Sequence, residues 1–167
     1  MPAVSLRPTE PEDLDFVLAA EADPEAVPNI GPRTRARHLS ALSNPDEDHL
    51  IVLAEGRPVG FALLTDLTGS NRNVEIHTIV ISDRGKGFGQ AAIRLLVDRA
   101  FDVHGAHRVW LDAVGANARA RHIYEKAGFT YEGAWREAWR RDDGSYDSLI
   151  FLGILDREWA EIRGRAG

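Results

Sequence analysis

The chain contains no cysteine among its 167 residues. This absence excludes disulfide bonds, thiolate metal ligands and a cysteine nucleophile, and it is compatible with a reducing compartment. No stretch approaches the roughly 18 consecutive apolar residues that a membrane-spanning helix needs. The first ten residues also lack the basic and apolar regions of a signal peptide. The sequence therefore predicts a cytoplasmic protein that does not associate with membranes.

Positive charge is scarce as well, with 20 basic against 26 acidic side chains and a net charge of −6. Residues 1–50 hold ten of the acidic and only four of the basic side chains. A nucleic-acid-binding protein needs the opposite balance, so this class is excluded. An acidic N-terminal stretch suits a cationic partner such as an amine. Acidic residues are equally common in the solvated loops of ordinary proteins.

The remaining composition is that of a folded domain, with 44% hydrophobic and 28% charged residues. The length suits one domain, and no internal repeat divides it. Prolines and glycine gather in residues 23–48, but this zone is too short to separate domains and is interpreted as a loop containing a helix. The sequence therefore predicts a single domain over residues 1–167.

Apolar periodicity and turn residues predict the elements in order. They are a helix over 11–21, a β-hairpin of 49–55 and 59–67, a strand over 73–82, a helix from 90 that ends at Gly105, a strand over 108–114, a helix over 117–127 followed by Gly128, strands over 129–133 and 146–154, and a closing helix over 156–163. This alternation of strands and helices indicates an α/β (α+β) fold with helices against a mixed sheet.

A glycine-rich turn joins the strand over 73–82 to the helix that follows, and it reads Arg84, Gly85, Lys86, Gly87, Phe88, Gly89 and Gln90. Glycines let a backbone approach a ligand closely, and the free N–H groups of a first helical turn attract anions. The glycine spacing fits neither a Walker A loop nor the dinucleotide-binding fingerprint. Turns of this kind also occur for packing reasons alone.

About 30 residues further on, a second segment strengthens the case. Together the two segments resemble the hallmark motifs of the GNAT (GCN5-related N-acetyltransferase) superfamily, which are R-x-x-G-x-G and N-x-x-A-x-x-x-Y-E-K-x-G-F. The residues that match are Arg84, Gly87, Gly89, Asn117, Ala120, Tyr124, Glu125, Lys126, Gly128 and Phe129. The resemblance extends over about 50–167 and only loosely over 1–48. Residues 132–148 are similar to the subgroup that includes ribosomal-protein N-terminal and spermidine acetyltransferases.

This resemblance implies a mixed, mostly antiparallel central sheet of six to seven strands flanked by helices. It assigns residues 49–167 to an acetyl-CoA-binding core and residues 1–48 to acceptor-side helices and a loop. The implied reaction is direct attack of a primary amine on acetyl-CoA, without a metal or a covalent enzyme intermediate. The acceptor is expected to be a cationic small molecule or peptide, such as a protein N-terminus, a polyamine or another small amine. The alternative is a non-catalytic module that binds acyl-CoA for regulation.

The resemblance also implies which residues bind the coenzyme. Backbone groups of Ile79 and Ile81 would pair with the pantetheine chain, and Asn117 would bind the same arm, although Asn117 also suits a helix N-cap. Backbone N–H groups would hold the pyrophosphate, and they belong to Gly85, Lys86, Gly87, Phe88, Gly89 and Gln90. The side chains of Arg84 and Lys86 are candidates for phosphate contacts, although a basic surface loop needs no ligand.

Two residues are candidates for proton transfer. Tyr124 matches the family tyrosine near the coenzyme sulfur, where a phenol can protonate a departing thiolate; alternatively it is a core tyrosine. Glu75 is the candidate base, directly or through water, or else an ion-paired strand residue. Strand alternation places Glu75, His77 and Ile79 on one face. His77 is an alternative base because imidazole titrates near neutral pH.

The remaining aromatic and histidine residues give weaker signals. Trp135 and Trp139 suit a core, a substrate cleft or a dimer interface, and a homodimer is therefore a possibility that the sequence leaves open. The histidines have no spacing that predicts a metal site.

Overall fold

The structure is a computed structural model that describes residues 1–166. Its strands are β1 (Val4–Pro8), β2 (Asp48–Ala54), β3 (Arg57–Thr65), β4 (Asn73–Ile81), β5 (Arg108–Val114), β6 (Thr130–Arg140) and β7 (Tyr146–Leu155). Its α-helices are α1 (Leu14–Glu21), α2 (Arg35–Ala41), α3 (Phe88–Asp102), α4 (Ala118–Ala127) and α5 (Asp156–Arg165), with 3₁₀ turns η1 (Pro11–Asp13) and η2 (Val27–Asn29).

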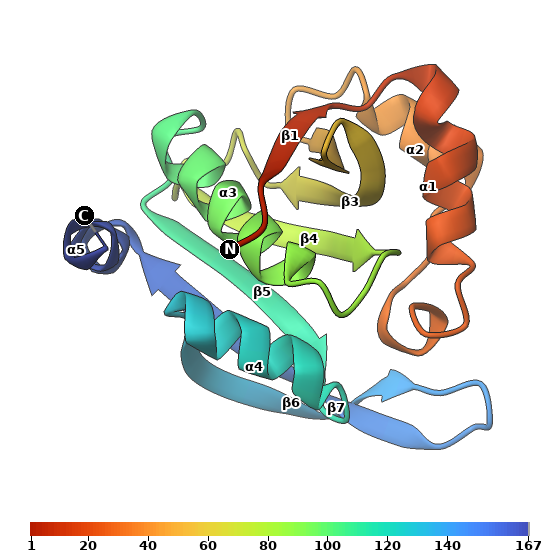
Figure 1. The fold of residues 1–167 in the computed structure, drawn as a ribbon. Coiled ribbons are helices and arrows are strands. Elements are labelled where there is room, and N and C mark those ends of the chain that lie inside the picture. The colour runs from red at the N-terminus through yellow and green to blue at the C-terminus, as the bar shows by residue number, and fades with distance from the viewer. Residues whose placement is uncertain (167) are drawn as a thin grey trace.

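All seven strands form one sheet in the order β1-β2-β3-β4-β5-β7-β6 (Figure 1). Every neighbouring pair is antiparallel except β4 and β5, which are parallel. The expected mixed, mostly antiparallel sheet of six to seven strands with flanking helices is therefore confirmed. The parallel pair lies at the centre of the sheet, and it becomes the location of the candidate site.

Helices cover both faces of the sheet on the N-terminal side of this pair. β2 shows this directly, because Leu50 packs in the main core cluster with α3, whereas Ile51 packs with Leu14 and Val17 of α1. A strand that is buried on both faces has a continuous apolar run rather than an alternating one. The run His-Leu-Ile-Val-Leu-Ala in β2 is of this kind.

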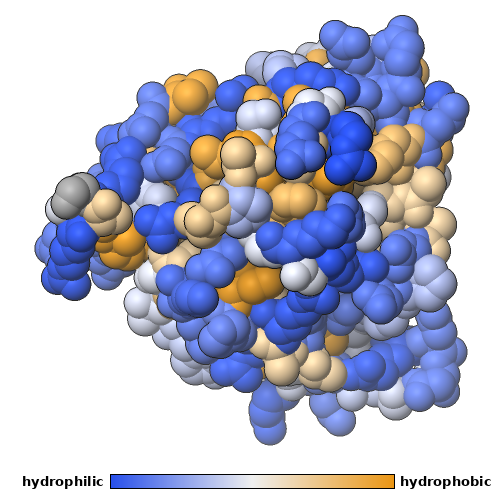
Figure 2. Space-filling view, in the orientation of Figure 1, coloured by the Kyte–Doolittle hydropathy of each residue, from blue (hydrophilic) through white to orange (hydrophobic). Residues whose placement is uncertain are grey.

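The helix α3 fills the main core as its periodicity predicts. Ile93, Leu96, Val97 and Ala100 are all fully buried. Figure 1 shows α3 and α4 side by side in front of the sheet. Hydrophilic residues dominate this face of the molecule, and hydrophobic residues show only in patches between them (Figure 2). None of the helices within residues 1–166 is long and apolar enough to cross a membrane.

The helix α4 begins and ends at the residues that the sequence predicts. The Asn117 side chain accepts a hydrogen bond of 3.2 Å from the backbone N–H of Ala120, which satisfies one of the free donors of the first turn. Gly128 ends the helix with a φ of 109°, a left-handed conformation that favours glycine. A Cβ at Gly128 would also lie 2.3 Å from Ile162, so no other residue fits there without a shift.

Two strands differ from the sequence prediction. The sequence analysis did not predict β1, a five-residue strand at the edge of the sheet that contains an arginine and ends in proline. Proline is tolerated at a sheet edge because no partner strand needs its missing N–H. The strand predicted over 129–133 extends to Arg140. Its register with β7 shifts twice, after Tyr131 and after Trp135, and these bulges break the alternation that sequence reasoning relies on.

Candidate active site

The sheet opens at its centre, between the two parallel strands. β4 and β5 pair only over Asn73–Glu75 and Arg108–Trp110, and beyond Glu75 they diverge (Figure 1). Backbone groups of β4 that face β5 are therefore left without a partner strand and open into a cavity of about 460 Å³. The cavity places unpaired main-chain donors and acceptors beside the glycine-rich turn that follows β4.

A bulge in β4 lies beside this opening. Leu63 of β3 is opposite Thr78, but the next residue, Leu64, is opposite Ile76. His77 is therefore an extra residue with no partner on β3. An extra residue of this kind reverses the faces toward which the later side chains point.

The bulge corrects one sequence prediction. Glu75 and His77 do lie together, because His77 Nδ1 is 3.2 Å from Glu75 Oε1. Ile79 does not share their face; it packs in the main core cluster with Val74 and Ile76. Strict alternation fails here because it counts residues along one strand and cannot register an insertion relative to the neighbouring strand.

The cavity has two sides of different chemistry, because it extends from one face of the sheet to the other. On the side of α3 and α4 it is lined by Ile79, Ile81, Gly87, Phe88, Gly89, Gln90, Asn117, Ala120, Ile123 and Tyr124. On the side of α1 and η2 it is lined by Glu25, Ala26, Asn29, Ile30, Gly31, Glu75, His77, Asp112 and Trp139. The first side is mostly apolar with free backbone groups, and the second side carries carboxylates.

The glycine-rich turn has the conformation of an anion site. Gly85 and Gly87 have φ values of 81° and 78°, which are left-handed and favour glycine. Gly87 caps α3 and has no side chain to accept a hydrogen bond from the N–H groups of the first turn, which belong to Phe88, Gly89 and Gln90. Free N–H groups and the helix dipole at the same place attract phosphate. The turn therefore fits the diphosphate of a coenzyme.

The two basic side chains of the turn have acidic partners within the protein. Arg84 Nη1 lies 3.1 Å from Asp23 and 3.0 Å from Glu25. Lys86 Nζ lies 2.8 Å from Asp83, and its side chain is 57% exposed. Arg84 lines the cavity, whereas Lys86 is absent from the cavity lining formed by residues 1–166. Any anion bound at this turn would therefore be held mainly by backbone groups.

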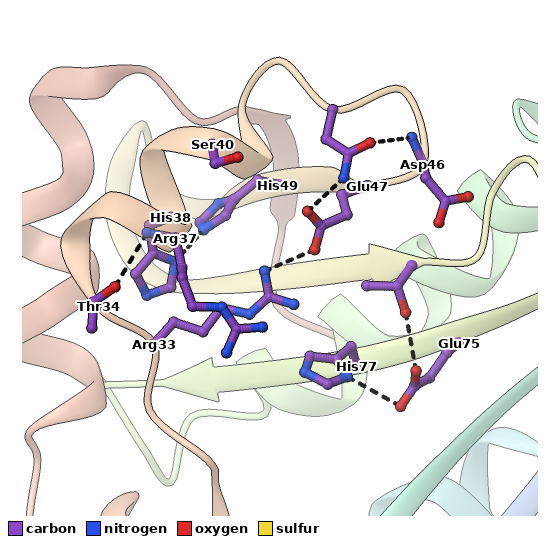
Figure 3. A network of polar contacts seen from close by, with 12 residues as sticks. Arg33, Thr34, Arg37, His38, Ser40, Asp46, Glu47, His49, Glu75 and His77 are labelled. Carbon is purple, nitrogen blue, oxygen red and sulfur yellow. Dashed lines mark hydrogen bonds and ion pairs between the residues drawn. The ribbon is translucent and has the colours of Figure 1, made fainter.

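The acidic residues of the N-terminal region are also engaged by partners (Figure 3). Glu47 accepts a hydrogen bond of 2.7 Å from Arg33, and Glu21 lies 3.0 Å from the buried His38. Asp46 accepts a hydrogen bond from the Thr68 hydroxyl. The charges in 21–25 and 46–48 that would attract a cationic acceptor are thus largely paired or hydrogen-bonded. Attraction to the cavity must come mainly from carboxylates elsewhere in its lining.

Glu75 is held in a fixed position on the side of the cavity that faces α1 and η2. The Thr65 hydroxyl donates a hydrogen bond of 3.0 Å to Glu75 Oε2, and His77 contacts the other carboxylate oxygen (Figure 3). The Glu75 side chain is only 17% exposed. A carboxylate that is held on both oxygens and open to a cavity is suitably placed to accept a proton.

Tyr124 closes the other end of the cavity from α4. Its side chain is buried, and its ring centroid lies 6.2 Å from that of Phe129. Burial, and secondarily the negative charge of Asp112, raise the pKa of the Tyr124 phenol well above its usual value. The phenol is therefore fully protonated at neutral pH and can act as a proton donor.

Sequence reasoning missed Asp112 and left the role of Trp139 open between a core, a substrate cleft and a dimer interface. Asp112 of β5 lines the cavity, and burial followed by the charge of Glu75 raises the pKa of its carboxyl group. Trp139 of β6 also lines the cavity, whereas Trp135 is 64% exposed and packs on Phe151 outside it. One signal was available for Asp112, since it is the only acidic residue in the otherwise apolar run Val-Trp-Leu-Asp-Ala-Val.

A sheet that opens between two parallel strands, with an anion-binding turn at one end and a buried phenol beside it, is the architecture of a transferase that uses an acyl coenzyme. Residues 15–129 match the family model described as the acetyltransferase (GNAT) family. The chain belongs to this family, and it is an acetyl-CoA-dependent N-acetyltransferase.

Several known proteins are similar over much of the chain. Spermidine N(1)-acetyltransferase of Escherichia coli K12 is 29% identical over 94% of this chain and 88% of its own length. The putative ribosomal N-acetyltransferase YdaF of Bacillus subtilis is 33% identical over 65% of this chain and 59% of its own. A crystal structure of Vibrio cholerae spermidine N-acetyltransferase with CoA and spermine superposes with a TM-score of 0.85 at 23% identity, covering 94% and 98% of the two chains. The last comparison confirms the fold.

Proposed function

We propose that this enzyme transfers the acetyl group of acetyl-CoA to a primary amine of a small polycationic acceptor of the spermidine type. The observation that carries the proposal is the chemistry of the acceptor side of the cavity, where Glu75 and Asp112 lie with Trp139. Carboxylates and an aromatic face are the groups that bind alkylammonium ions. Relatives named spermidine N(1)-acetyltransferase support the same acceptor class.

The coenzyme would occupy the other side of the cavity, as the sequence motifs imply. The backbone N–H groups from Gly85 to Gln90 would hold the diphosphate, and backbone groups of Ile79 and Ile81 on the open edge of β4 would pair with the pantetheine arm. Asn117, which caps α4, lines the same side. The ion pairs of Arg84 and Lys86 make their side chains secondary contributors. When bound, the coenzyme supplies the thioester that carries the acetyl group.

Glu75 would remove a proton from the acceptor. An alkylammonium group with a pKa near 10 is almost fully charged at neutral pH and has no free electron pair for attack. Glu75 takes the proton directly or through water, with His77 as the neighbouring alternative, and the amine nitrogen then attacks the thioester carbonyl. The new C–N bond forms as the C–S bond breaks, and Tyr124 gives its proton to the departing thiolate. The positively charged nitrogen then loses its second proton to the Tyr124 phenolate, which leaves a neutral amide and restores the phenol.

A turnover screen tests the proposed function. The purified protein is incubated with acetyl-CoA and a panel of spermidine, spermine, an aminoglycoside, single amino acids and a short peptide with a free N-terminus. Thiol release and the mass of the product are then measured. We expect the polyamines to be acetylated with the highest kcat/KM. Preferential acetylation of the peptide or the aminoglycoside would contradict the polyamine assignment and leave the acetyltransferase activity intact.

The choice of base is tested by two matched substitutions. Glu75→Gln and His77→Gln each replace a titratable group with a neutral amide. If Glu75 is the base, we expect Glu75→Gln to lower kcat/KM about a hundredfold or more at pH 7, and the deficit to shrink toward pH 10 as the amine loses its proton unaided. A larger loss in His77→Gln would assign the base to His77.

The remaining sequence predictions are consistent with this proposal. The segment 1–48 would form the acceptor side, since residues 25–31 line that part of the cavity, and 49–167 would form the coenzyme-binding core. We expect the enzyme to act in the cytoplasm.

The surface formed by Trp135 and Phe151 is the candidate interface of a homodimer, which sedimentation would test. Coenzyme binding without thiol release for any amine would favour the regulatory-module alternative.

A further inference from the structure

Asp112 points into the cavity beside the candidate base, although it belongs to neither sequence motif. Glu75 of β4 and Trp110 of β5 are register partners, so their side chains share a face of the sheet. Asp112 lies two residues beyond Trp110 and points to the same face. Because the strands diverge at this point, Asp112 faces the opening and lines the cavity together with Glu75 and His77.

Asp112 shares the lining of the cavity with Glu75, His77 and Tyr124. Glu75 raises the pKa of Asp112 and His77 lowers it, after a larger effect of burial. Asp112 in turn raises the pKa of Tyr124. The carboxylate of Asp112 therefore faces the same cavity as the candidate base and the candidate acid, where the acceptor nitrogen must lie for the reaction to occur.

Asp112 differs from the other carboxylates of this region because it is not engaged. Glu75 is held by Thr65 and His77, and Glu25 is paired with Arg84. The pKa of the Asp112 carboxyl group is shifted only by burial and by the charges of Glu75 and His77. Its carboxylate has no hydrogen-bond partner among residues 1–166. The Asp112 side chain is exposed and lines the cavity, so its carboxylate is free to bind a cation that enters there.

We propose that Asp112 contacts the acceptor nitrogen and binds it as an ammonium ion, so that Glu75 and Asp112 together hold the amine before one proton is removed. This inference rests on the proposed function and assigns the residue that selects a charged acceptor. The carboxylate of this pair that does not take the proton stays ionised, and its negative charge stabilises the positive charge that the nitrogen acquires as it attacks the carbonyl carbon.

Steady-state kinetics of Asp112→Asn with spermidine test the inference. The substitution keeps the shape of the side chain and removes its charge. Loss of a charge-assisted hydrogen bond predicts a rise in the KM for spermidine of about tenfold to a hundredfold. The KM for acetyl-CoA should stay within about twofold, because the coenzyme lies on the other side of the cavity. Asp112→Glu, which restores the charge, should recover part of the spermidine affinity.

Matched controls separate this role from a structural one. Asp142→Asn makes the same chemical change in the exposed turn after β6 and should alter neither KM. If Asp112→Asn fails to fold, Asp112→Ser provides the same comparison, with acetyl-CoA binding as the check on folding. An unchanged spermidine KM in an active variant overturns the inference alone. A wild-type enzyme that acetylates no amine in the screen overturns the proposed function, and the inference with it.

Discussion

Tyr124 combines a buried ring with a hydroxyl group that reaches the cavity. Burial and the charge of Asp112 raise the pKa of its phenol, so the proposed proton donor stays protonated well beyond the physiological pH range. We expect Tyr124→Phe to lower kcat by about a hundredfold or more, because the thiolate must then leave without a proton. The KM for acetyl-CoA should change little, since the ring still packs on Phe129.

Stopped-flow measurement of thiol release, with spermidine as acceptor, would determine this loss. Tyr146→Phe is the matched control, because Tyr146 is 56% exposed and lies outside the cavity. Equal rates for wild type and Tyr124→Phe would show that another group, or water, protonates the thiolate.

His49 makes stability depend on pH. Its side chain is buried next to His38 and Arg33, within range of Glu21 and Glu47, and burial followed by the charge of His38 lowers its pKa from 6.5 to about 4. Between these two values the unfolded chain binds a proton that the folded chain excludes. Stability is therefore complete above pH 6.5 and falls as the pH drops toward 4.

This linkage predicts that the free energy of unfolding decreases by about 2 kcal/mol between pH 6.5 and 5. Urea titrations at several pH values would measure the decrease. His49→Gln keeps a polar side chain but cannot titrate, so its curve should be flatter over the same window. Identical slopes for the two proteins would exclude His49 as the source.

The glycines at the start of α3 should respond differently to substitution by alanine. Gly87 has a left-handed φ of 78°, and an added Cβ would lie 3.3 Å from Pro2. Gly87→Ala should therefore cost about 1–2 kcal/mol of stability. It should also raise the KM for acetyl-CoA several-fold, because the N–H groups of the first turn of α3 would be displaced.

Gly89 provides the internal comparison for this prediction. It lies within the first turn of α3, and a Cβ there would meet Ile123 at 3.6 Å, an ordinary contact. Gly89→Ala should stabilise the helix by about 0.5–1 kcal/mol. Thermal unfolding and coenzyme titration of both variants test the contrast. A Gly87→Ala protein with wild-type stability and KM would show that the turn adapts freely.

Local patterns predicted most elements but not the features that depend on pairing between strands. Asn117 and Gly128 delimit α4 from sequence alone, because capping is a local property. The bulge at His77 exists only relative to β3, so no pattern within β4 reveals it. Asp112 was missed for the same reason: the divergence of β4 and β5 gives it access to the cavity, and divergence is a property of the sheet.

The same distinction, between features set by one segment and features set by contacts between segments, applies to the candidate site. The glycine-rich turn and Tyr124 belong to contiguous motifs and were found by resemblance. The pairing of Arg84 with Asp23 and Glu25 joins segments about 60 residues apart and could not be read from either one. The sequence therefore indicated the coenzyme side of the site better than the acceptor side, which is assembled from separate segments.

The whole sheet is joined across its centre by only three residue pairs, those between Asn73–Glu75 and Arg108–Trp110. A coenzyme that pairs with β4 beyond this point would connect the two halves. At a coenzyme concentration of about 100 times Kd, the stabilisation is about 2.7 kcal/mol. We therefore expect Tm to rise by about 5–10 °C with CoA.

Hydrogen exchange would locate this stabilisation. Within residues 77–81, the amides that face β5 should exchange fast in the free protein and slow down with CoA, whereas the amides bonded to β3 and those of β2, which is paired on both sides, should change little. A rise in Tm without protection of residues 77–81 would mean that the coenzyme binds without pairing to β4.

The open edge of β4 has a consequence for handling the protein. Strand edges without a partner can add a strand from another molecule, and most proteins protect them with charges, proline or a covering loop. Here we expect the edge to stay accessible, because we propose that the coenzyme pairs with it. Concentrated stocks without coenzyme are therefore prone to self-association and precipitation, and adding CoA during purification should keep the preparation clear and monodisperse.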